Sequence, residues 1–379
     1  MNAEIPYLYW LYSVNGIGAK TLKMLKKYVG NARNIYDLSE YDLSWFLNRT
    51  QVERLMKSRM DWDIEGEYAK LGKAGISFYP LGYPGYPDKL INIPDPPAAL
   101  FVKGSLPDPA LPSAALIGTR KCSGYGNVMA KQLGEALAKR GVLVISGMAR
   151  GIDGIGQRAV CEAGGRTYAV LGCGVDIVYP QENGRLYEKL ILKGGIISEY
   201  IPGTEPRASL FPPRNRIISG LSDTVIVVEA KEKSGTMITV DMALEQGREV
   251  YAIPGRVIDG LSCGCNRLIK QGAGLIISID EFIDDILKES KRKLTDEVND
   301  LKKEGHNKKT PSPLKQTVSL TKEEQPVYAA LDYIPRSIEQ ISAICPQVTF
   351  ESLLKILITF CLKGIALQMG AGYYCRREK

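Results

Sequence analysis

Short apolar runs alternate with amphipathic stretches through the middle of the chain. The runs lie at Ala114–Ile117, Val142–Ile145, Tyr168–Leu171, Ile196–Ile197, Val225–Val228 and Val250–Ile253. Between them, stretches such as 128–139 and 238–246 carry apolar residues at helical spacing. Continuous apolar strands separated by helices are typical of a parallel sheet covered on both faces. The pattern therefore predicts an α/β domain, with a doubly wound, Rossmann-like parallel sheet, over residues 91–287.

Residues 1–90 show a helical pattern instead. Apolar residues at helical spacing are Leu8, Leu11, Val14, Leu22, Leu25 and Tyr28, and they lie on both sides of Asn15-Gly16-Ile17-Gly18. Such a glycine turn resembles a helix-hairpin-helix, whose backbone N–H groups approach a phosphate, but a purely structural turn fits a single copy equally well. We expect a small helical domain of the SAM or helix-hairpin-helix kind. Six prolines within 79–97 predict an extended connector.

The last quarter of the chain divides into two parts. Residues 288–320 are charged and poor in apolar residues, and they predict a flexible linker. Helical spacing returns within 321–379, and a glycine-rich end over 364–374 is suited to a two-stranded wing. We expect a winged-helix domain there. Such domains bind DNA or mediate protein contacts, and the low basic content of this one does not favour DNA.

Charge is distributed unevenly along the chain. The formal net charge is +7, yet residues 95–287 carry 21 Lys and Arg against 21 Asp and Glu. A polyanion site in the central domain must therefore be a local patch and not a general field.

Several classes of chemistry are disfavoured by residue content. His306 is the single histidine and lies in a polar, lysine-rich stretch, so a catalytic triad or a histidine-ligated metal is not expected. The eight cysteines include one close pair, Cys263 and Cys265, without a second chelating pair. No apolar run reaches the ~18 residues of a membrane span, and Met1–Trp10 lacks a basic signal-peptide region. We expect a cytoplasmic protein with reduced thiols and without a metal, a cofactor or a membrane partner.

The segment Phe211-Pro212-Pro213-Arg214-Asn215-Arg216 places two arginines and an asparagine where a helix begins. Proline suits the first helical turn because it lacks the N–H that is unpaired there. The remaining free N–H groups and the helix dipole favour an anion, and the arginines add full charge.

Similar residues follow the other predicted strands. Ligands of open parallel sheets bind beyond the carboxyl ends of the strands. The candidate binding residues at those ends are Gly118, Thr119, Arg120, Ser123, Ser146, Gly147, Arg150, Gly151, Lys233, Ser234, Gly235 and Thr236. Together with Phe211, Arg214, Asn215 and Arg216, they form a row of phosphate-binding groups suited to an extended polyanion.

Three enzyme hypotheses compete with this interpretation. A dinucleotide enzyme or a P-loop ATPase is disfavoured, since the chain lacks both G-x-G-x-x-G after the first strand and G-x-x-x-x-G-K-[ST]. A nucleotide-cleaving hydrolase would use Glu229 or Asp153 as its acid–base residue. We expect Asp153 to cap the following helix instead, and Glu229 to pair with a neighbouring Lys or Arg.

An ordered series of motifs over about 75–280 points to one family. The series reads Gly118-Thr119-Arg120, Ser146-Gly147-x-Ala149-Arg150-Gly151-Ile152-Asp153, Tyr179-Pro180-x-x-Asn183, Ser198-Glu199-Tyr200, Phe211-x-x-Arg214-Asn215-Arg216, Lys233-Ser234-Gly235, Pro254-Gly255 and Asn266-x-Leu268-Ile269. It resembles the DNA processing protein A family of bacteria (DprA, also called Smf). One departure is Gln157, near a place where the family usually has histidine.

The resemblance implies a non-enzymatic protein that binds and protects incoming single-stranded DNA and loads the RecA recombinase during natural transformation. It assigns phosphate contacts to Arg120, Arg150, Arg214, Arg216 and Lys233, with backbone N–H groups at Gly147, Gly151 and Gly235. Phe211 is either a base-stacking face or a core residue. The family dimerises late in the sheet, which points to Leu268, Ile269 and Leu275 as a homodimer interface unless these three are ordinary core.

Overall fold

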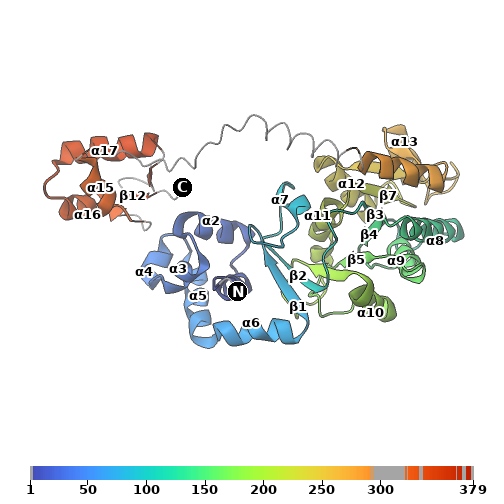
Figure 1. Cartoon of the computed structure of the whole chain (residues 1–379), viewed down its shortest axis with the longest axis horizontal. Helices are drawn as coiled ribbons and strands as arrows, with labels where there is room; N and C mark the ends of the chain where they lie inside the picture. The colour runs from blue at the N-terminus through green and yellow to red at the C-terminus, as the bar shows by residue number, and fades with distance from the viewer. Residues whose placement is uncertain are drawn as a thin grey trace. The chain divides into compact units, whose positions relative to one another are not determined.

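A computed structural model describes residues 3–290, 292, 321, 323–332, 336–363, 365–368 and 373–376 (Figure 1). The chain divides into two compact units, Gly66–Lys302 and a second made of Met1–Glu65 with Lys303–Lys379. Within the described part, no helix is both long and apolar enough to span a membrane.

The first 65 residues fold into short helices, as their apolar spacing predicts. These are α1 (Ile5–Ser13), α2 (Ala19–Val29), α3 (Ala32–Asp37), α4 (Glu40–Ser44) and α5 (Arg49–Asp61). Side chains of Asn31, Ser39 and Asn48 cap the starts of α3, α4 and α5 by accepting hydrogen bonds from backbone N–H groups. Gly16, in the turn between α1 and α2, has a φ of 91°, which glycine adopts without strain.

The central unit contains a nine-stranded sheet. Its strands are β1 (Ile76–Pro80), β2 (Ala99–Gly104), β3 (Ser113–Ile117), β4 (Leu143–Ser146), β5 (Thr167–Val170), β6 (Gly195–Ser198), β7 (Thr224–Val227), β8 (Glu249–Ala252) and β9 (Gly274–Leu275). They lie in the order β1-β2-β6-β5-β4-β3-β7-β8-β9. In this order, all strands from β6 through β3 to β9 run parallel to one another. Strand β2 runs antiparallel to β6, and β1 runs antiparallel to β2. The six predicted strands and the parallel sheet are confirmed.

The edge formed by β1 and β2 differs from expectation. The segment expected to be an extended connector holds the end of β1 and the short helix α7 (Asp88–Ile91), which follows α6 (Ile64–Lys73) and β1. The sheet therefore begins at Ile76, before the domain boundary expected at residue 90. The prolines lie mainly in the turns between β1 and β2, where a missing N–H costs nothing.

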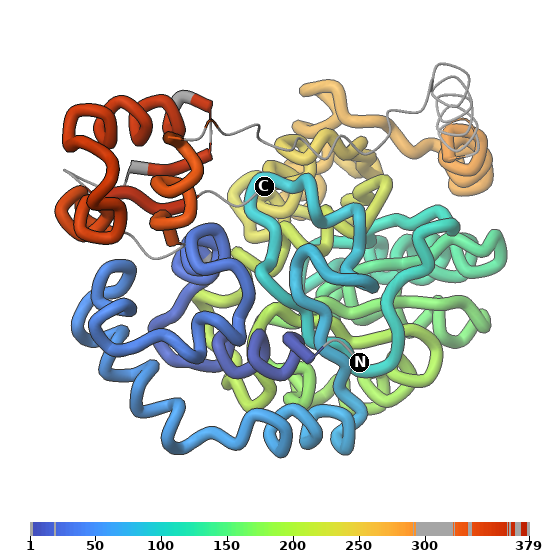
Figure 2. Tube along the Cα trace, turned by 60° about the vertical axis from the view of Figure 1, so that its left-hand side comes forward, coloured from blue at the N-terminus to red at the C-terminus, as the bar shows by residue number. Residues whose placement is uncertain are grey.

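Helices cover both faces of the sheet, which is why its strands read as continuous apolar runs. They are α8 (Gly124–Lys139), α9 (Ile152–Glu162), α10 (Gly184–Lys193), α11 (Phe211–Leu221), α12 (Gly235–Glu245) and α13 (Cys263–Lys270). Neighbouring residues of β3 serve opposite cores: Leu116 packs with Leu133 of α8, and Ile117 packs with Ile217 of α11. Each fully buried side chain of this kind contributes about 1.5–3 kcal/mol. Helices α8 and α9 run side by side on one face (Figures 1 and 2).

The strand order reverses beside β3. From β3 the chain proceeds through β4, β5 and β6 in one direction, and then crosses to β7 on the other side of β3. The connections leaving β3 and β7 therefore diverge, which opens a crevice beyond the carboxyl ends of these two strands.

The C-terminal part contains α15 (Glu324–Ala330), β10 (Arg336–Ser337), α16 (Ile338–Ile344), α17 (Phe350–Leu362), β11 (Ala366–Gln368) and β12 (Tyr373–Arg376). The strands pair antiparallel in the order β10-β12-β11. Residues 279–290 are helical and bury Phe282 and Ile283 against the central sheet. The expected linker, 288–320, otherwise lies outside the described residues, apart from 292.

Candidate nucleic-acid interface

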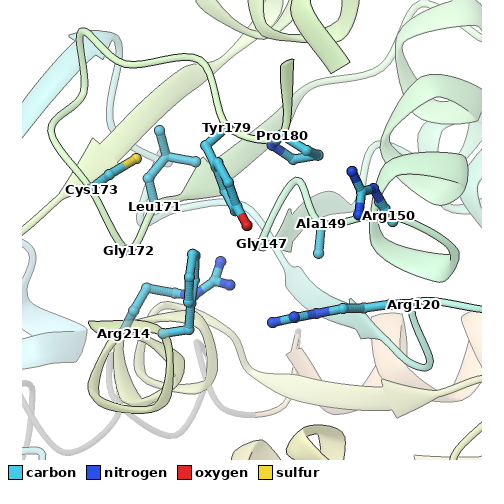
Figure 3. Close-up of a pocket in the computed structure, with 11 residues that line it drawn as sticks. Arg120, Gly147, Ala149, Arg150, Leu171, Gly172, Cys173, Tyr179, Pro180 and Arg214 are labelled. Atoms are coloured by element: carbon cyan, nitrogen blue, oxygen red, sulfur yellow. The ribbon is translucent and has the colours of Figure 1, made fainter. Parts of the chain in front are cut away.

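A cleft of about 540 Å³ opens in the crevice beyond β3 and β7, and we call it the main cleft. A narrower side pocket adjoins it beneath Tyr179 (Figure 3). Predicted site residues that line the main cleft are Gly118, Thr119, Arg120, Phe211, Arg214, Asn215, Ser234, Gly235 and Thr236, and the side pocket adds Gly147 and Arg150. Segments that follow five different strands, β3 to β7, thus meet at one site.

Arg214 is the buried cation of this site. It extends from α11 with 5% of its surface exposed, and its guanidinium donates to the carbonyl oxygen of Val170 at the end of β5. Burial lowers the pKa of Arg214 to about 10, although the Asp153 carboxylate acts in the opposite direction, so the side chain remains charged at neutral pH. The Nε atom is buried and has no hydrogen-bond partner within the described structure. A Cβ atom at Gly147 would overlap this guanidinium, which is why glycine is required there.

Asp153 is the acidic partner of Arg214. It lies in the first turn of α9, 7% exposed, and accepts a hydrogen bond of 3.1 Å from the backbone N–H of Gly147. Burial raises the pKa of Asp153, while Arg214 lowers it. The expectation that Asp153 caps the helix is wrong, since Gly151 occupies the N-cap position.

Two aromatic rings form one wall shared by the cleft and the pocket. The rings of Phe211 and Tyr179 stack with centroids 5.4 Å apart and an interplanar angle of 30°. Arg120 and Arg214 lie over the Phe211 ring at 5.6 and 5.9 Å. Phe211 is partly exposed and lines both cavities, so the structure favours an exposed aromatic face over a buried core position for this residue. Tyr179 was not among the predicted site residues, although it is 40% exposed and lines both cavities.

The N-terminus of α12 lies on the other side of the main cleft. Ser234 is its N-cap residue, but no side chain caps the helix, and the buried Ser234 Oγ has no partner within the described structure. Gly235 and Thr236 begin the helix and line the cleft. Free N–H groups and the positive end of the helix dipole therefore face an open space, as in anion sites. Lys233 is exposed beside them but does not line the cleft.

Arg216 has a different position from the one the motif implied. It is 9% exposed, and its Nη atoms donate to both carboxylate oxygens of Glu199 at 2.7 Å. Its Nε donates to the Asp95 carbonyl oxygen at 2.7 Å, and Nη1 also donates to the Pro213 carbonyl oxygen. With these donors occupied and no place in either cavity lining, Arg216 ties α11 to neighbouring segments.

Three other predicted residues support the loops from beneath. Ser123 caps α8 and donates through its hydroxyl and N–H to the buried Glu229. The Glu229 carboxylate therefore pairs with a helix cap and not with the expected Lys or Arg. Ser146 donates to the Leu116 carbonyl oxygen at 2.6 Å, and Gly151 has a φ of 71° beside the backbone of Thr119.

Arg150, another predicted site residue, is exposed, and its side chain forms an ion pair with Glu182 at 2.7 Å.

The three residues expected at a dimer interface differ in exposure. Leu268 is 5% exposed and belongs to the core, and Ile269 is partly buried against the same core. Leu275 is 47% exposed on β9, the edge strand of the sheet. Leu268 is thus explained as a core residue, which leaves Ile269 and Leu275 as candidates.

Chemistry other than binding has few candidate groups here. Among the described residues, no group of three or more His, Cys, Asp or Glu side chains is placed to hold a metal ion. None of the eight cysteines forms a disulfide bond in the described part of the chain. His306 lies outside the described residues.

Comparison with known proteins places the chain in a family. A family model described as DNA recombination-mediator protein A matches residues 78–287. DNA processing protein DprA of Streptococcus pneumoniae is 44% identical over 193 residues, which cover 51% of this chain and 68% of that protein. Its namesake from Bacillus subtilis is 41% identical over 235 residues, which cover 59% of this chain and 78% of that one.

Solved structures agree with this match. The X-ray structure of DNA processing protein A from Streptococcus pneumoniae superposes with a TM-score of 0.63 at 34% identity, covering 74% of this chain and 97% of that one. A structure of the Helicobacter pylori protein, concerned with its single-stranded DNA binding mode, gives 0.51 at 31% identity, with coverages of 56% and 96%. The chain therefore belongs to the family of DNA recombination-mediator protein A, in agreement with its ordered motifs.

Proposed function

We propose that the protein binds single-stranded DNA at the main cleft and acts in DNA processing during recombination. The observation that carries the proposal is the combination of a buried arginine, an open helix N-terminus and a stacked aromatic pair around one cleft. Each of these three features recognises one part of a nucleic-acid strand that is common to all sequences.

Phosphates are the first of these parts. Arg120 and Arg214 supply positive charge on one side of the cleft, and the N-terminus of α12 supplies N–H groups on the other. Arg150 and Lys233 lie just outside, where they would contact neighbouring phosphates of the same strand. Phosphate contacts of this kind give affinity without sequence selectivity.

Bases are the second part. The Tyr179–Phe211 pair offers a partly exposed aromatic face beside the arginines. Stacking of a base on such a face contributes about 1–3 kcal/mol and tolerates any base. A base in a duplex is already stacked and paired, so this face favours single strands.

In this proposal the protein is not an enzyme. The two acids that a nucleotide-cleaving reaction would require have other partners: Asp153 accepts from Gly147 beside Arg214, and Glu229 accepts from Ser123. We propose that the bound strand is protected and handed to the RecA recombinase during natural transformation, as the family resemblance implies.

The smaller parts and the assembly complete the proposal. The α1–α2 turn would act as a helix-hairpin-helix-like contact, and the elements from α15 to β12 would form a winged helix. We further propose a cytoplasmic homodimer that pairs at the edge strand β9, with Ile269 and Leu275 in the contact.

The test of binding is fluorescence anisotropy with labelled oligonucleotides of several sequences, comparing the unmodified protein with Arg214→Gln. Arg140→Ala is a suitable control. Arg140 follows the last residue of α8, near the amino ends of the parallel strands and away from the cleft, and it forms an exposed ion pair with Asp284. We expect Arg214→Gln to lose binding to every sequence and Arg140→Ala to keep it. Equal affinity of both variants would refute the cleft as the binding site.

A further inference from the structure

The loop between β4 and α9 has an unusual backbone. Met148 has a φ of 51°, and it is the single non-glycine residue with positive φ among those the structure describes. Such a conformation persists only where its surroundings hold it. The loop matters for the site because Gly147, Ala149 and Arg150 line the side pocket (Figure 3).

Gln157 of α9 holds this residue from within the core. Its side chain is fully buried, and its Oε1 accepts a hydrogen bond of 3.0 Å from the Met148 N–H. Its Nε2 donates to the Tyr168 carbonyl oxygen at 2.9 Å and to Thr167 Oγ1 at 3.1 Å. One amide therefore ties the loop to β5.

Two other side chains hold adjacent atoms of the same loop. Asp153 accepts from the Gly147 N–H, and Asn183 Nδ2 donates to the Met148 carbonyl oxygen at 2.8 Å. The peptide groups on either side of Met148 are thus fixed by groups from different elements. Two of these side chains also interact with an arginine: the Asp153 carboxylate attracts the charge of Arg214, and Asn183 accepts a hydrogen bond from Arg158. The hydrogen bonds of the Gln157 side chain go to Met148, Thr167 and Tyr168 and to neither of these arginines, so its direct link to the site is the loop.

We propose that Gln157 is a positioning residue for DNA binding: its amide fixes Met148 in the left-handed conformation and so presents Ala149 and Arg150, the exposed part of the loop, to the strand. The proposal rests on the proposed function. The role requires an acceptor toward Met148 and a donor toward Tyr168 at the same time, which an amide supplies at every pH.

Two substitutions convert this requirement into a pH effect of opposite sign. In Gln157→His, a neutral imidazole supplies one acceptor and one donor, but a protonated one has two donors and cannot accept from Met148. In Gln157→Glu, the protonated carboxyl supplies one donor and one acceptor, but the carboxylate cannot donate to Tyr168. Burial raises the pKa of such a carboxyl. Histidine should therefore work at high pH and glutamate at low pH.

The experiment measures single-stranded DNA affinity from pH 5.5 to pH 8.5 for the unmodified protein and both variants. The ionisable groups on the elements around the amide include Asp153 and Arg158 on α9, Tyr168 on β5 and Arg214 on α11, and all three proteins share them. Gln246→His is the matched control, because the Gln246 amide donates to the Arg216 carbonyl oxygen, away from the loop. Amide exchange of a peptide covering 146–152, corrected for intrinsic pH dependence, reports on the loop without DNA.

We expect Gln157→His to lose at least tenfold in affinity, relative to the unmodified protein, as the pH falls, and Gln157→Glu to lose as much as the pH rises. Loop exchange should quicken in the same two ranges, and Gln246→His should follow the unmodified protein. General destabilisation cannot produce opposite signs. If both variants follow the unmodified protein at every pH, or both change in the same direction, Gln157 has no positioning role and the proposed function still stands. If the unmodified protein binds no strand at any pH, both proposals are wrong.

Discussion

Arg214 and Arg216 lie two residues apart on α11 and have opposite surroundings. Residues at this spacing point about 200° apart around a helix, so both cannot face one cleft. Arg214 faces the main cleft, while Arg216 makes a bidentate pair with Glu199 on the other side. The motif alone does not distinguish the two arginines, but helical geometry already predicts that one of them is structural.

Arg120 is the exposed cation of the main cleft, so its removal should affect binding without affecting the fold. We expect Arg120→Ala to weaken binding to all sequences by about 10- to 100-fold, since a charge-assisted contact contributes about 1.5–3 kcal/mol. The log–log salt dependence of affinity should flatten by about 0.7, as one phosphate contact is lost. Anisotropy titrations at several salt concentrations measure both quantities. A loss confined to one base composition would mean base readout instead.

Removal of Arg216 should have the opposite profile. Its side chain and that of Glu199 are 11% and 13% exposed, so Arg216→Ala removes the cation that pairs with a largely buried carboxylate. We expect the free energy of unfolding to fall by about 3–5 kcal/mol. The salt dependence of DNA affinity should keep its slope, because no phosphate contact is removed. Urea unfolding followed by circular dichroism measures the first effect, and a flattened slope would return Arg216 to the binding surface.

Cys173 lines the side pocket but should be chemically silent there. Burial raises the pKa of its thiol to about 11, so only about 0.1% is thiolate at pH 8. The folded state therefore keeps a proton that the unfolded state releases above about pH 8.5, and the contribution of this group to stability falls as the pH rises past that value. Iodoacetamide labelling at pH 8, read by mass spectrometry, should leave Cys173 unmodified until urea is added. Rapid labelling of the folded protein would contradict this.

At the scale of elements, a single substitution at the N-terminus of α12 should affect DNA binding and protein stability differently. Gly235→Asp places a negative charge in the first turn, where it interacts favourably with the helix dipole by about 0.3–1 kcal/mol. The same charge would repel a phosphate. We expect thermal stability to stay equal or rise while single-stranded DNA affinity falls by at least tenfold.

Gly235→Ala is the control for this change, because a Cβ atom at Gly235 would meet no atom within 4 Å. This substitution should leave the thermal stability and the single-stranded DNA affinity nearly unchanged. If Gly235→Asp keeps full affinity, the α12 N-terminus is not a phosphate site.

Periodicity was informative for elements buried on both faces and less so elsewhere. The six central strands are apolar runs because helices cover both sides, and each was predicted to within a residue or two. The two antiparallel strands at one side of the sheet, β1 and β2, were missed. The edge strand β1 alternates buried with exposed or half-buried positions and lies next to a proline-rich segment, so it does not form a continuous apolar run. Tyr179 was missed for another reason: its partner Phe211 comes from a different crossover, and one sequence does not bring the two together.

At the scale of the whole molecule, two copies would offer two clefts to one strand. Binding at the second cleft then becomes intramolecular and gains from effective concentration. In Ile269→Glu, the charge would fall in the contact that we propose beside β9. We expect a folded monomer that binds long strands more weakly and very short ones nearly as before.

Sedimentation at micromolar concentration measures the assembly, with Leu192→Glu as the control, since Leu192 is 85% exposed on α10. If the unmodified protein is already a monomer, the homodimer proposal is wrong. If Ile269→Glu unfolds, Ile269 belongs to the core, as Leu268 does, and the contact must be sought elsewhere.

The central claim is that the main cleft holds a single strand through its phosphates and bases and performs no chemistry on it. The most direct measurement is a competition titration of single strands against duplexes of equal length, with the recovered DNA and added ATP analysed for turnover. We predict preference for single strands regardless of sequence, with intact DNA and unhydrolysed ATP. Equal affinity for duplex, or turnover that persists through re-purification and disappears in Asp153→Asn or Glu229→Gln, would contradict the account.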